Sequence, residues 1–155
     1  MTDEEIVVAI RGLAASKGLP PAASPEAVAE AERVIGYSLP PLLRRLYLEV
    51  ANGGFGPRGG ILGVPGGEWR GDWADITDAY QAFSSAPDNS VPSGLIWLFE
   101  WGDAIWSLVD CRDPSGSMWG WDPNDGLEDA LFSTGQTLSE WLADAIAGRD
   151  AIPQK

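Results

Sequence analysis

Two segments of this sequence combine tryptophan with several carboxylates. The first is residues 68–73, in the order Glu-Trp-Arg-Gly-Asp-Trp, and Asp75 follows it closely. The second is residues 119–129, which hold four acids and two indoles in eleven positions. An indole buries a large area at a protein interface while its N–H still finds an acceptor, and carboxylates pair with basic side chains. These residue types therefore predict recognition of a basic protein surface.

The candidate binding residues are the tryptophans and carboxylates of these two segments. They are Glu68, Trp69, Asp72, Trp73, Asp75, Trp119, Trp121, Asp122, Asp125, Glu128 and Asp129. Other interpretations stay open. Trp69 or Trp73 would also serve as a lid over the core, and Asp72, Asp75 and Asp78 as helix caps or acids favoured in the first turn of a helix. The second segment is also typical of a solvated turn rich in Asp, Asn, Pro and Gly.

Several kinds of reactive site are excluded by composition. The chain has no histidine, so it has no histidine metal site, no Ser/His or Cys/His nucleophile pair, and no histidine base near neutral pH. Cys111 is the one cysteine, which excludes an intrachain disulfide and a cysteine zinc cluster. Residues 122–126 are similar to a calcium loop, but an EF-hand needs glutamate where Ser133 stands. We therefore expect no catalytic residue, metal or cofactor.

The charge of the chain is strongly acidic and uneven. The formal net charge is −13; residues 1–80 hold 11 acids and 7 bases, whereas residues 81–155 hold 12 acids and 3 bases. Binding to phosphates depends on Lys and Arg that displace counterions, so this balance argues against nucleic acid and anionic membranes as partners. It would attract a basic partner, although solubility alone also explains an acidic surface.

Length and composition indicate one soluble domain. A chain of 155 residues, 45% of them hydrophobic, is large enough for a core without disulfides. No run approaches the roughly 20 apolar residues that cross a bilayer. Residues 1–5 carry three acids, the opposite of the basic start of a secretory signal. We therefore expect a cytoplasmic protein.

Hydrophobic periodicity and capping residues predict five helices. Thr2 with Glu5 and Thr137 with Glu140 form capping boxes, and Ser24-Pro25 is a typical helix start. The predicted helices are residues 3–16, 25–35, 40–50, 76–83 and 138–147.

Runs of strand-forming residues predict an antiparallel sheet in the second half of the chain. The predicted strands are residues 95–101, 104–110, 117–121 and a short fourth strand at 131–133. A Gly-Asp pair between the first two is a hairpin signal. Residues 52–67, with eight glycines and two prolines, predict a loop around at most a short strand at 60–64.

The order of these elements predicts the fold class. Helices first, an antiparallel sheet in the middle and a closing helix are typical of an α+β domain. We predict one domain over residues 1–148 and a C-terminal tail at 149–155. Trp97, Trp101 and Trp106, at even or near-even spacing in the predicted hairpin, are expected to pack in its core.

The helix that Pro40 opens is followed by an Asn-Gly-Gly turn. The residues are Leu39-Pro40-Pro41-Leu42-Leu43-Arg44-Arg45-Leu46-Tyr47, then Asn52-Gly53-Gly54, and later a tryptophan-rich hairpin that contains Trp101-Gly102. In this order and spacing they resemble the signature of the SUKH superfamily, over roughly residues 25–147. The matching signature residues are Leu39, Pro40, Asn52, Gly53, Gly54, Trp101 and Gly102. We expect them to be structural, since glycine and proline set backbone geometry.

The resemblance implies a non-catalytic binding protein with a SUKH-like fold. In bacteria it implies an immunity protein that binds a cognate toxin, often a nuclease, and blocks its active surface. For a nuclease toxin the chemistry is coherent, because an acidic protein can occupy a basic phosphate-binding cleft as a mimic of nucleic acid. We expect a basic protein partner and a monomer or weak dimer.

Two other functions remain as alternatives. The first is a regulatory interaction scaffold like the fungal members of the superfamily, which control cell-wall synthesis; those members usually carry long disordered arms, which this sequence lacks. The second is a carboxylate enzyme acting on glycosides, since tryptophans stack on sugar rings. Such an enzyme needs two carboxyls roughly 5 to 10 Å apart in a cleft, and nothing in the sequence pairs them.

Overall fold

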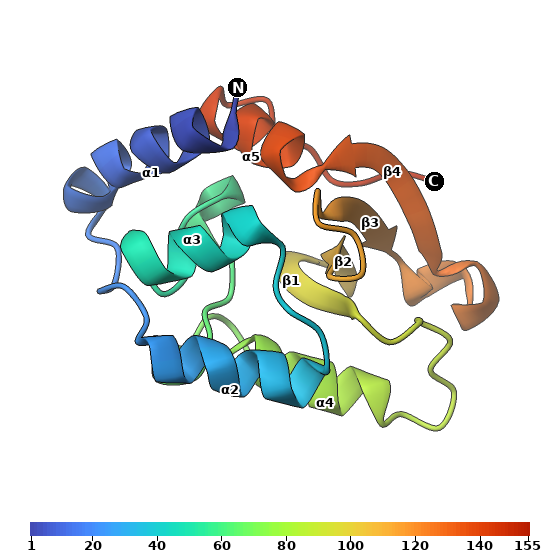
Figure 1. Ribbon diagram of the computed structural model, residues 1–155. Coiled ribbons are helices and arrows are strands. Elements are labelled where there is room, and N and C mark those ends of the chain that lie inside the picture. Colours follow the sequence, from blue (N-terminus) through green and yellow to red (C-terminus); the bar gives the residue numbers. More distant parts are fainter.

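Five helices flank a four-stranded antiparallel sheet whose strand order is β1-β2-β3-β4 (Figure 1). The computed structural model describes residues 1–155. The helices are α1 (Asp3–Lys17), α2 (Pro25–Ile35), α3 (Pro41–Glu49), α4 (Ile76–Ser84) and α5 (Leu138–Ile146). The strands are β1 (Leu95–Gly102), β2 (Ile105–Asp110), β3 (Ser117–Trp121) and β4 (Leu131–Thr137), and the short 3-10 turns are η1 (Pro57–Gly59), η2 (Pro123–Asp125) and η3 (Leu127–Asp129). The predicted α+β class is confirmed.

Hydrogen bonds at the helix ends explain where the first and last helices begin. Thr2 and Glu5 exchange side-chain-to-backbone bonds at the start of α1, and Thr137 and Glu140 do the same at the start of α5. A capping box of this kind satisfies two N–H groups that the first helical turn leaves without partners. Both boxes were predicted from the sequence and are confirmed.

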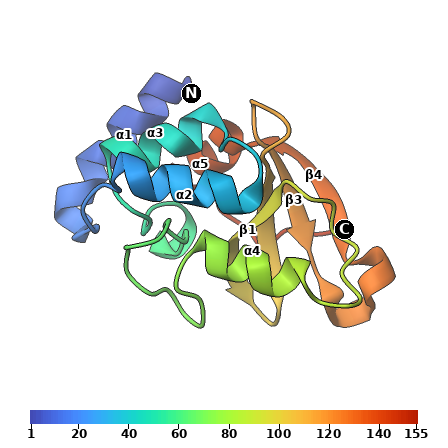
Figure 2. The same ribbon diagram turned by 60° about the horizontal axis from the view of Figure 1, so that its bottom comes forward.

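The sheet lies between α4 on one face and α5 on the other (Figures 1 and 2). On the α4 side, the Phe83 ring stacks on Trp97 with centroids 5.0 Å apart and lies 5.5 Å from Trp106. On the α5 side, the ring of Trp141 approaches Phe99 at 6.3 Å. Aromatic pairs in these geometries stabilise beyond their buried area. Each face of the sheet therefore carries its own aromatic layer.

Because of a β-bulge, the single strand β1 contributes aromatic side chains to both faces of the sheet. The register against β2 shifts between Trp97, which pairs with Leu108, and Phe99, which pairs with Ser107. An extra residue in a strand turns the side chains after it to the other face. Trp101 consequently lies on the Phe99 side, where its Nε1 donates to Ser107 Oγ at 2.8 Å. The three hairpin tryptophans are buried as predicted. Trp97 and Trp101 nevertheless lie on different faces of the sheet, which their even spacing alone would not predict.

The Asn52 side chain fastens the chain after α3 to the glycine-rich segment that follows. Its Oδ1 accepts from Val64 N at 2.7 Å, and its Nδ2 donates to Val64 O at 3.2 Å. Both bonds are buried, because Asn52 is only 6% exposed. The backbone comes this close because Gly63 and Gly67 lack side chains; a Cβ on either would collide with the Asn52 amide.

Residues 60–64 do not form a strand. Leu62 N donates to Leu98 O at 3.1 Å, and this is the one backbone bond between the segment and β1. The Tyr47 hydroxyl donates to Leu62 O at 2.5 Å, while Asn52 occupies the backbone groups of Val64. Because side chains take the groups that a neighbouring strand would need, the pairing cannot extend into a ladder.

The predicted tail, residues 149–155, forms neither helix nor strand. It returns across the sheet, where Pro153 lies so close to Gly120 that a Cβ on the glycine would be 2.9 Å from the proline ring. The Nζ of Lys155 lies 4.0 Å from the Asp125 carboxylate. The end of the chain therefore lies near the turn that joins β3 to β4 (Figure 1).

Replacing Asn52 by alanine should destabilise the fold, because it leaves the N–H and C=O of Val64 buried without partners. Each such group costs about 1–3 kcal/mol, so we expect the free energy of unfolding to fall by about 2–4 kcal/mol in urea denaturation followed by circular dichroism. Asn89→Ala is the matched control, since Asn89 makes the same two bonds to Val91 in a half-buried turn. Equal losses in the two variants would contradict the role of burial.

The thiol of Cys111, just after β2, should be unreactive in the folded protein. Burial, with repulsion from the neighbouring Asp110 carboxylate, raises the pKa of this thiol to about 12. Because the thiolate is the nucleophile, the protonated thiol reacts slowly at any pH well below that value. We expect iodoacetamide near pH 8 to modify the protein by mass spectrometry only after guanidinium chloride is added. Labelling of the folded protein at the unfolded rate would show that the thiol is accessible and ionised.

Candidate protein-binding surface

The first candidate segment forms a tight loop directly before α4. We call residues 68–75 the Trp69 loop. Arg70 and Trp73 exchange backbone hydrogen bonds at 3.2 and 3.3 Å across a two-residue turn, in which Gly71 takes a left-handed φ of 62°. Trp69 projects to solvent beside this turn and, at 69% exposed, is the most exposed large hydrophobic residue of the chain. It is therefore no lid over the core, and an exposed indole on an ordered loop is suited to anchor a partner.

The acids of this loop have different surroundings. Asp75 caps α4 by accepting from Thr77 N at 2.8 Å and Asp78 N at 3.0 Å, and Asp78 accepts from Ala74 N at 3.0 Å. Asp75 thus fills the capping role that the sequence left open. Asp72 is exposed and accepts no hydrogen bond from the chain, so its carboxylate is free to meet a partner.

Arg70 and Trp73 attach the loop to the rest of the protein. The Nη2 of Arg70 packs against Gly54, where a Cβ would lie only 2.5 Å from it, and lies 3.4 Å from the exposed Glu68 carboxylate. Trp73 is half-buried, with its ring 4.9 Å from Phe83. Trp73 therefore belongs to the aromatic layer under α4.

The second candidate segment joins the end of β3 to an exposed turn. We call residues 122–130 the Asp125 loop. Asp122 accepts from Asn124 N at 3.0 Å and from its Nδ2 at 2.8 Å, and these bonds lower the pKa of the Asp122 carboxyl. Asn124 Nδ2 also donates to Asp103 O at 2.7 Å, which ties the loop to the β1–β2 hairpin. The three carboxylates that remain exposed are Asp125, Glu128 and Asp129.

The two tryptophans of the second segment lie on β3 rather than in the loop. Trp121 is 9% exposed, and its ring lies 5.2 Å from Phe83 and 5.9 Å from Trp97. Trp119 is half-buried, and its indole N–H is buried with no acceptor. Both indoles therefore pack toward the core of the protein rather than project from the Asp125 loop.

The structure places both loops on the α4 side of the molecule, at opposite ends of that helix (Figure 2). Phe83 of α4 connects them, since its ring contacts Trp73 at 4.9 Å and Trp121 at 5.2 Å. After α4, the Ser90 hydroxyl donates to Leu127 O at 3.3 Å, which holds the Asp125 loop beside the segment that leaves the helix. The same cluster of aromatic side chains around Phe83 therefore lies beneath both loops, which carry the exposed acids and the exposed indole.

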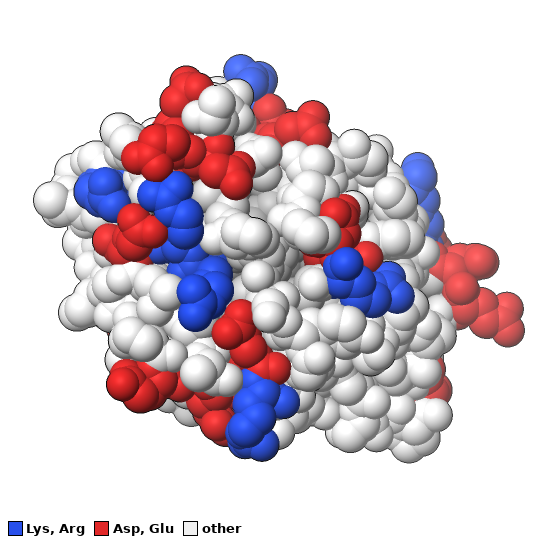
Figure 3. Space-filling view, in the orientation of Figure 1, with Lys and Arg blue, Asp and Glu red and all other residues white.

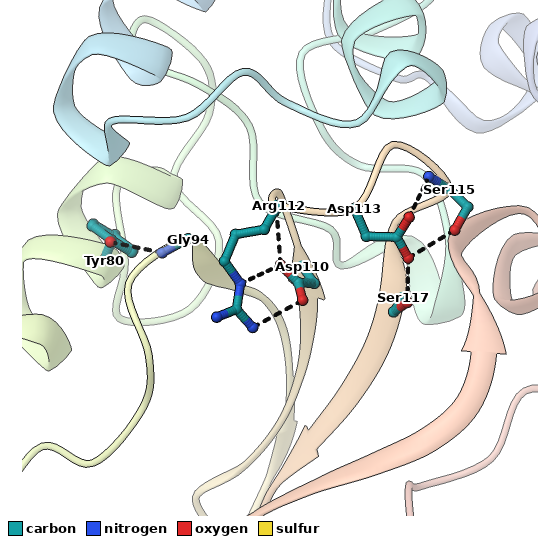
Figure 4. A network of polar contacts seen from close by, with 7 residues as sticks. All are labelled: Tyr80, Gly94, Asp110, Arg112, Asp113, Ser115 and Ser117. Atoms are coloured by element: carbon teal, nitrogen blue, oxygen red, sulfur yellow. Dashed lines mark hydrogen bonds and ion pairs between the residues drawn. The ribbon is translucent and has the colours of Figure 1, made fainter.

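Acids at the other end of β2 are engaged within the chain (Figure 4). Arg112 donates Nε and Nη2 to the two oxygens of Asp110, each at 3.0 Å. Asp113 accepts from the Ser117 hydroxyl and from Ser115 N and Oγ, and these bonds lower the pKa of its carboxyl. These carboxylates order the β2–β3 connection and are not free to pair with a partner.

The face formed by α1, α2 and α3 carries mixed charge (Figure 3). Arg45 pairs with Glu4 at 2.9 Å and Glu49 at 2.8 Å, and Arg44 lies 3.7 Å from Glu32. Acidic side chains also project at the right-hand edge of Figure 3, where η2 and η3 lie in Figure 1. Acidic side chains thus lie both on this helical face, where arginines pair with several of them, and at the Asp125 loop.

The structure gathers no three carboxylate or cysteine side chains in a way that could hold a metal ion. In residues 122–126, the Asp122 carboxylate is turned to Asn124 and Asp125 faces Lys155, so the similarity to a calcium loop does not extend to a shared centre. No helix has the length and apolar character needed to cross a membrane.

Arg58, a residue that no sequence motif indicated, lies in a groove beside the Trp69 loop. Its guanidinium lies 5.1 Å from the centroid of the Trp101 ring. A turn with proline at its second position usually has glycine at its third. The sequence signal was therefore the arginine that directly follows proline in Pro-Arg-Gly-Gly.

The seven signature residues hold the backbone at tight places or fill the core. Pro40 caps α3, Leu39 is buried, and Trp101 donates to the strand beside it. Gly53 takes a left-handed φ of 88°, and a Cβ there would lie 2.8 Å from Gly63 N. The side chains of Leu39, Pro40, Asn52 and Trp101 are buried.

Comparison with family models identifies the chain. The model of the SMI1 / KNR4 family (SUKH-1) matches residues 22–144, which include the four-stranded sheet and both candidate loops. A comparison with curated proteins returns no match. The matched family is the one that the Leu-Pro helix, the Asn-Gly-Gly turn and the tryptophan hairpin resembled, and the match covers most of the sequence. The chain therefore belongs to the SMI1 / KNR4 family (SUKH-1).

Proposed function

We propose that this protein is a cytoplasmic immunity protein. It binds a cognate polymorphic toxin whose active surface is basic, as in a nuclease, and neutralises the toxin by covering that surface. The observation that carries the proposal is Trp69, which is 69% exposed on a loop that is otherwise anchored, with the free carboxylate of Asp72 on the same loop. Membership of a family that points to protein–protein contact supports the same conclusion.

The candidate residues divide between contact and support. The residues that contact the toxin are the exposed members of the two loops: Glu68, Trp69, Asp72, Asp125, Glu128 and Asp129. The residues that hold them in place are Trp73, Asp75, Trp119, Trp121 and Asp122. A stable interface of this kind buries about 1,600 Å² in total, enough to include both ends of α4.

The charge distribution suits a nuclease partner. A phosphate-binding cleft is lined by Lys and Arg, and it keeps a strong positive potential when no nucleic acid is bound. Carboxylates that are free rather than paired within the chain can enter that potential and speed association. The net charge of −13 adds long-range attraction to the same partner.

A glycoside-hydrolysing site has no support in the carboxyl groups. Such a site needs a general acid whose pKa is raised. Hydrogen bonds instead lower the pKa of the carboxyls of Glu5, Glu30, Glu49, Asp113 and Asp122. The function we propose is binding rather than catalysis.

The direct test is to search the neighbouring genes for one that encodes a basic toxin domain and to co-express that domain with this protein. We expect a 1:1 complex in size-exclusion chromatography at low salt, together with loss of the toxin's activity. If the two proteins elute separately at low salt and the toxin stays active, the proposed function is wrong.

Trp69→Ala should weaken this complex without changing the fold. The indole is exposed in the free protein, so its removal should leave the melting temperature unchanged, whereas a buried interface anchor contributes about 2 kcal/mol or more, or roughly 30-fold in Kd. Isothermal titration calorimetry measures the loss. Val8→Ala, which truncates another exposed apolar side chain on α1, is the control. If the two variants bind the toxin equally well, Trp69 is not an anchor.

Neutralising the Asp125 loop should slow association. The triple variant Asp125→Asn, Glu128→Gln, Asp129→Asn removes three exposed charges, and we expect the association rate at low salt to fall roughly tenfold and to lose much of its salt dependence. Stopped-flow or surface plasmon resonance gives both quantities. Asp3→Asn, Glu26→Gln, Glu30→Gln is the matched control with the same change in net charge. An equal effect in the control would mean that net charge, rather than this loop, steers the partner.

A further inference from the structure

A groove with a volume of about 500 Å³ lies beside the Trp69 loop. Its aromatic walls come from several elements: Trp73 from the loop, Phe99 and Trp101 from β1, and Trp106 from β2. Arg58 of η1 also lines it. The groove thus combines apolar walls with a cation, in a chain whose bases are outnumbered by acids.

Arg58 occupies a backbone conformation that arginine rarely adopts. Gly59 N donates to Gly56 O at 3.1 Å, which closes a turn with Pro57 in its second position and Arg58 in its third. Arg58 has φ 53°, in the left-handed region that a non-glycine residue enters only at a cost. The chain places glycine at 56, 59 and 60, yet arginine stands at the strained position. Strain of this kind is typical of a residue held for its side chain.

Arg58 is also the one arginine without a carboxylate partner. The chain contains eight arginines, and the other seven each pair with an aspartate or glutamate. Arg58 makes no hydrogen bond; its recorded contact is the Trp101 ring, 5.1 Å from the guanidinium carbon. A guanidinium over an indole keeps its N–H donors free at the edge, where they can bind a carboxylate in a two-pronged geometry.

The other charges of the groove define what it can accept. Arg70 is already paired with Glu68 at 3.4 Å. Asp72 and Glu100 line the groove beyond ion-pair distance of Arg58. A doubly charged phosphate would meet these two acids, whereas one carboxylate matches the single positive charge that is unpaired. The aromatic walls suit apolar neighbours of that carboxylate.

We infer that Arg58 is the receptor for one glutamate or aspartate side chain of the protein partner, with apolar neighbours of that residue packed on Trp73, Phe99 and Trp101. The inference rests on the proposed function in that the partner is the toxin, and it adds that the toxin's basic surface carries one acid opposite this groove. In this pair the base belongs to this protein and the acid to the toxin, which is the reverse of the other charge pairs across the interface. One reversed pair fixes the orientation of the complex.

Two blocked peptides test the groove without the toxin: acetyl-Leu-Glu-Leu-amide and acetyl-Leu-Gln-Leu-amide. We expect the glutamate peptide to shift the NMR signals of Arg58 Nε–H and Trp101 Nε1–H saturably, and the glutamine peptide to bind roughly tenfold more weakly. Arg58→Gln should abolish the preference, and Arg33→Gln, a change at an exposed arginine of α2, should retain it. Equal binding of the two peptides, or a preference that survives Arg58→Gln, would overturn the inference.

Arg58→Gly separates the role of the side chain from its effect on folding. Glycine adopts φ 53° without strain, so this variant should melt no lower than the parent protein while losing the preference between the peptides. A melting temperature clearly below that of the parent would show that the arginine stabilises the fold instead, and would overturn its assignment as a receptor.

The toxin complex gives the second readout. Arg58→Gln should raise Kd roughly 10- to 100-fold, while Arg33→Gln leaves it unchanged. If the complex forms with equal affinity in both variants, the Arg58 inference fails and the proposed function stands. If the peptides are discriminated but the toxin does not bind, the groove stands as a carboxylate site and the toxin assignment fails.

Discussion

The two hydrogen bonds between the Asn52 side chain and the Val64 backbone are the constraint on which the candidate surface depends. They fix the point where the chain leaves α3 for the Trp69 loop. The end of the Trp69 loop is held at the same place, because Ile76 N, at the start of α4, donates to Gly63 O at 2.9 Å. Residues 65–75 therefore form an excursion whose two ends are fastened to one place. An exposed loop held in this way can present Trp69 without a large loss of entropy on binding.

Hydrogen bonds and ion pairs within the chain engage several of its acids. Asp110, Asp113 and Asp122 serve the backbone or a neighbouring arginine, and the helical face neutralises itself through Arg44 and Arg45. Asp72, Glu128 and Asp129 are exposed, have no basic partner within the chain and stand at the two ends of α4. Beneath them the aromatic layer around Phe83 gives both loops a common rigid base, so that they can act as one surface.

Local signals in the sequence predicted the elements well, and long-range contacts explain what they missed. Capping boxes, helix periodicity and runs of strand residues act over a few positions, so the helices, the strands and the α+β class followed from them. The exposure of Trp69 and the burial of Trp121 could not be predicted from these local signals, because acids and glycines surround both indoles in the sequence. The roles of Asn52 and Arg58 depend on Val64 and Trp101, which lie far along the chain, and no periodic pattern records such pairs.

The bulge in β1 has a consequence for how this chain can vary over evolution. One extra residue between Trp97 and Phe99 decides which side chains face α4 and which face α5. A relative that lost this residue would exchange the two faces from that point to the hairpin, and would need new aromatic partners in both helices at once. Packing on both sides of the sheet therefore constrains the length of the chain at this position, whereas the exposed Trp69 and Asp125 loops carry no such constraint. The fold thus separates a strand whose length is constrained by packing from two loops whose length is not.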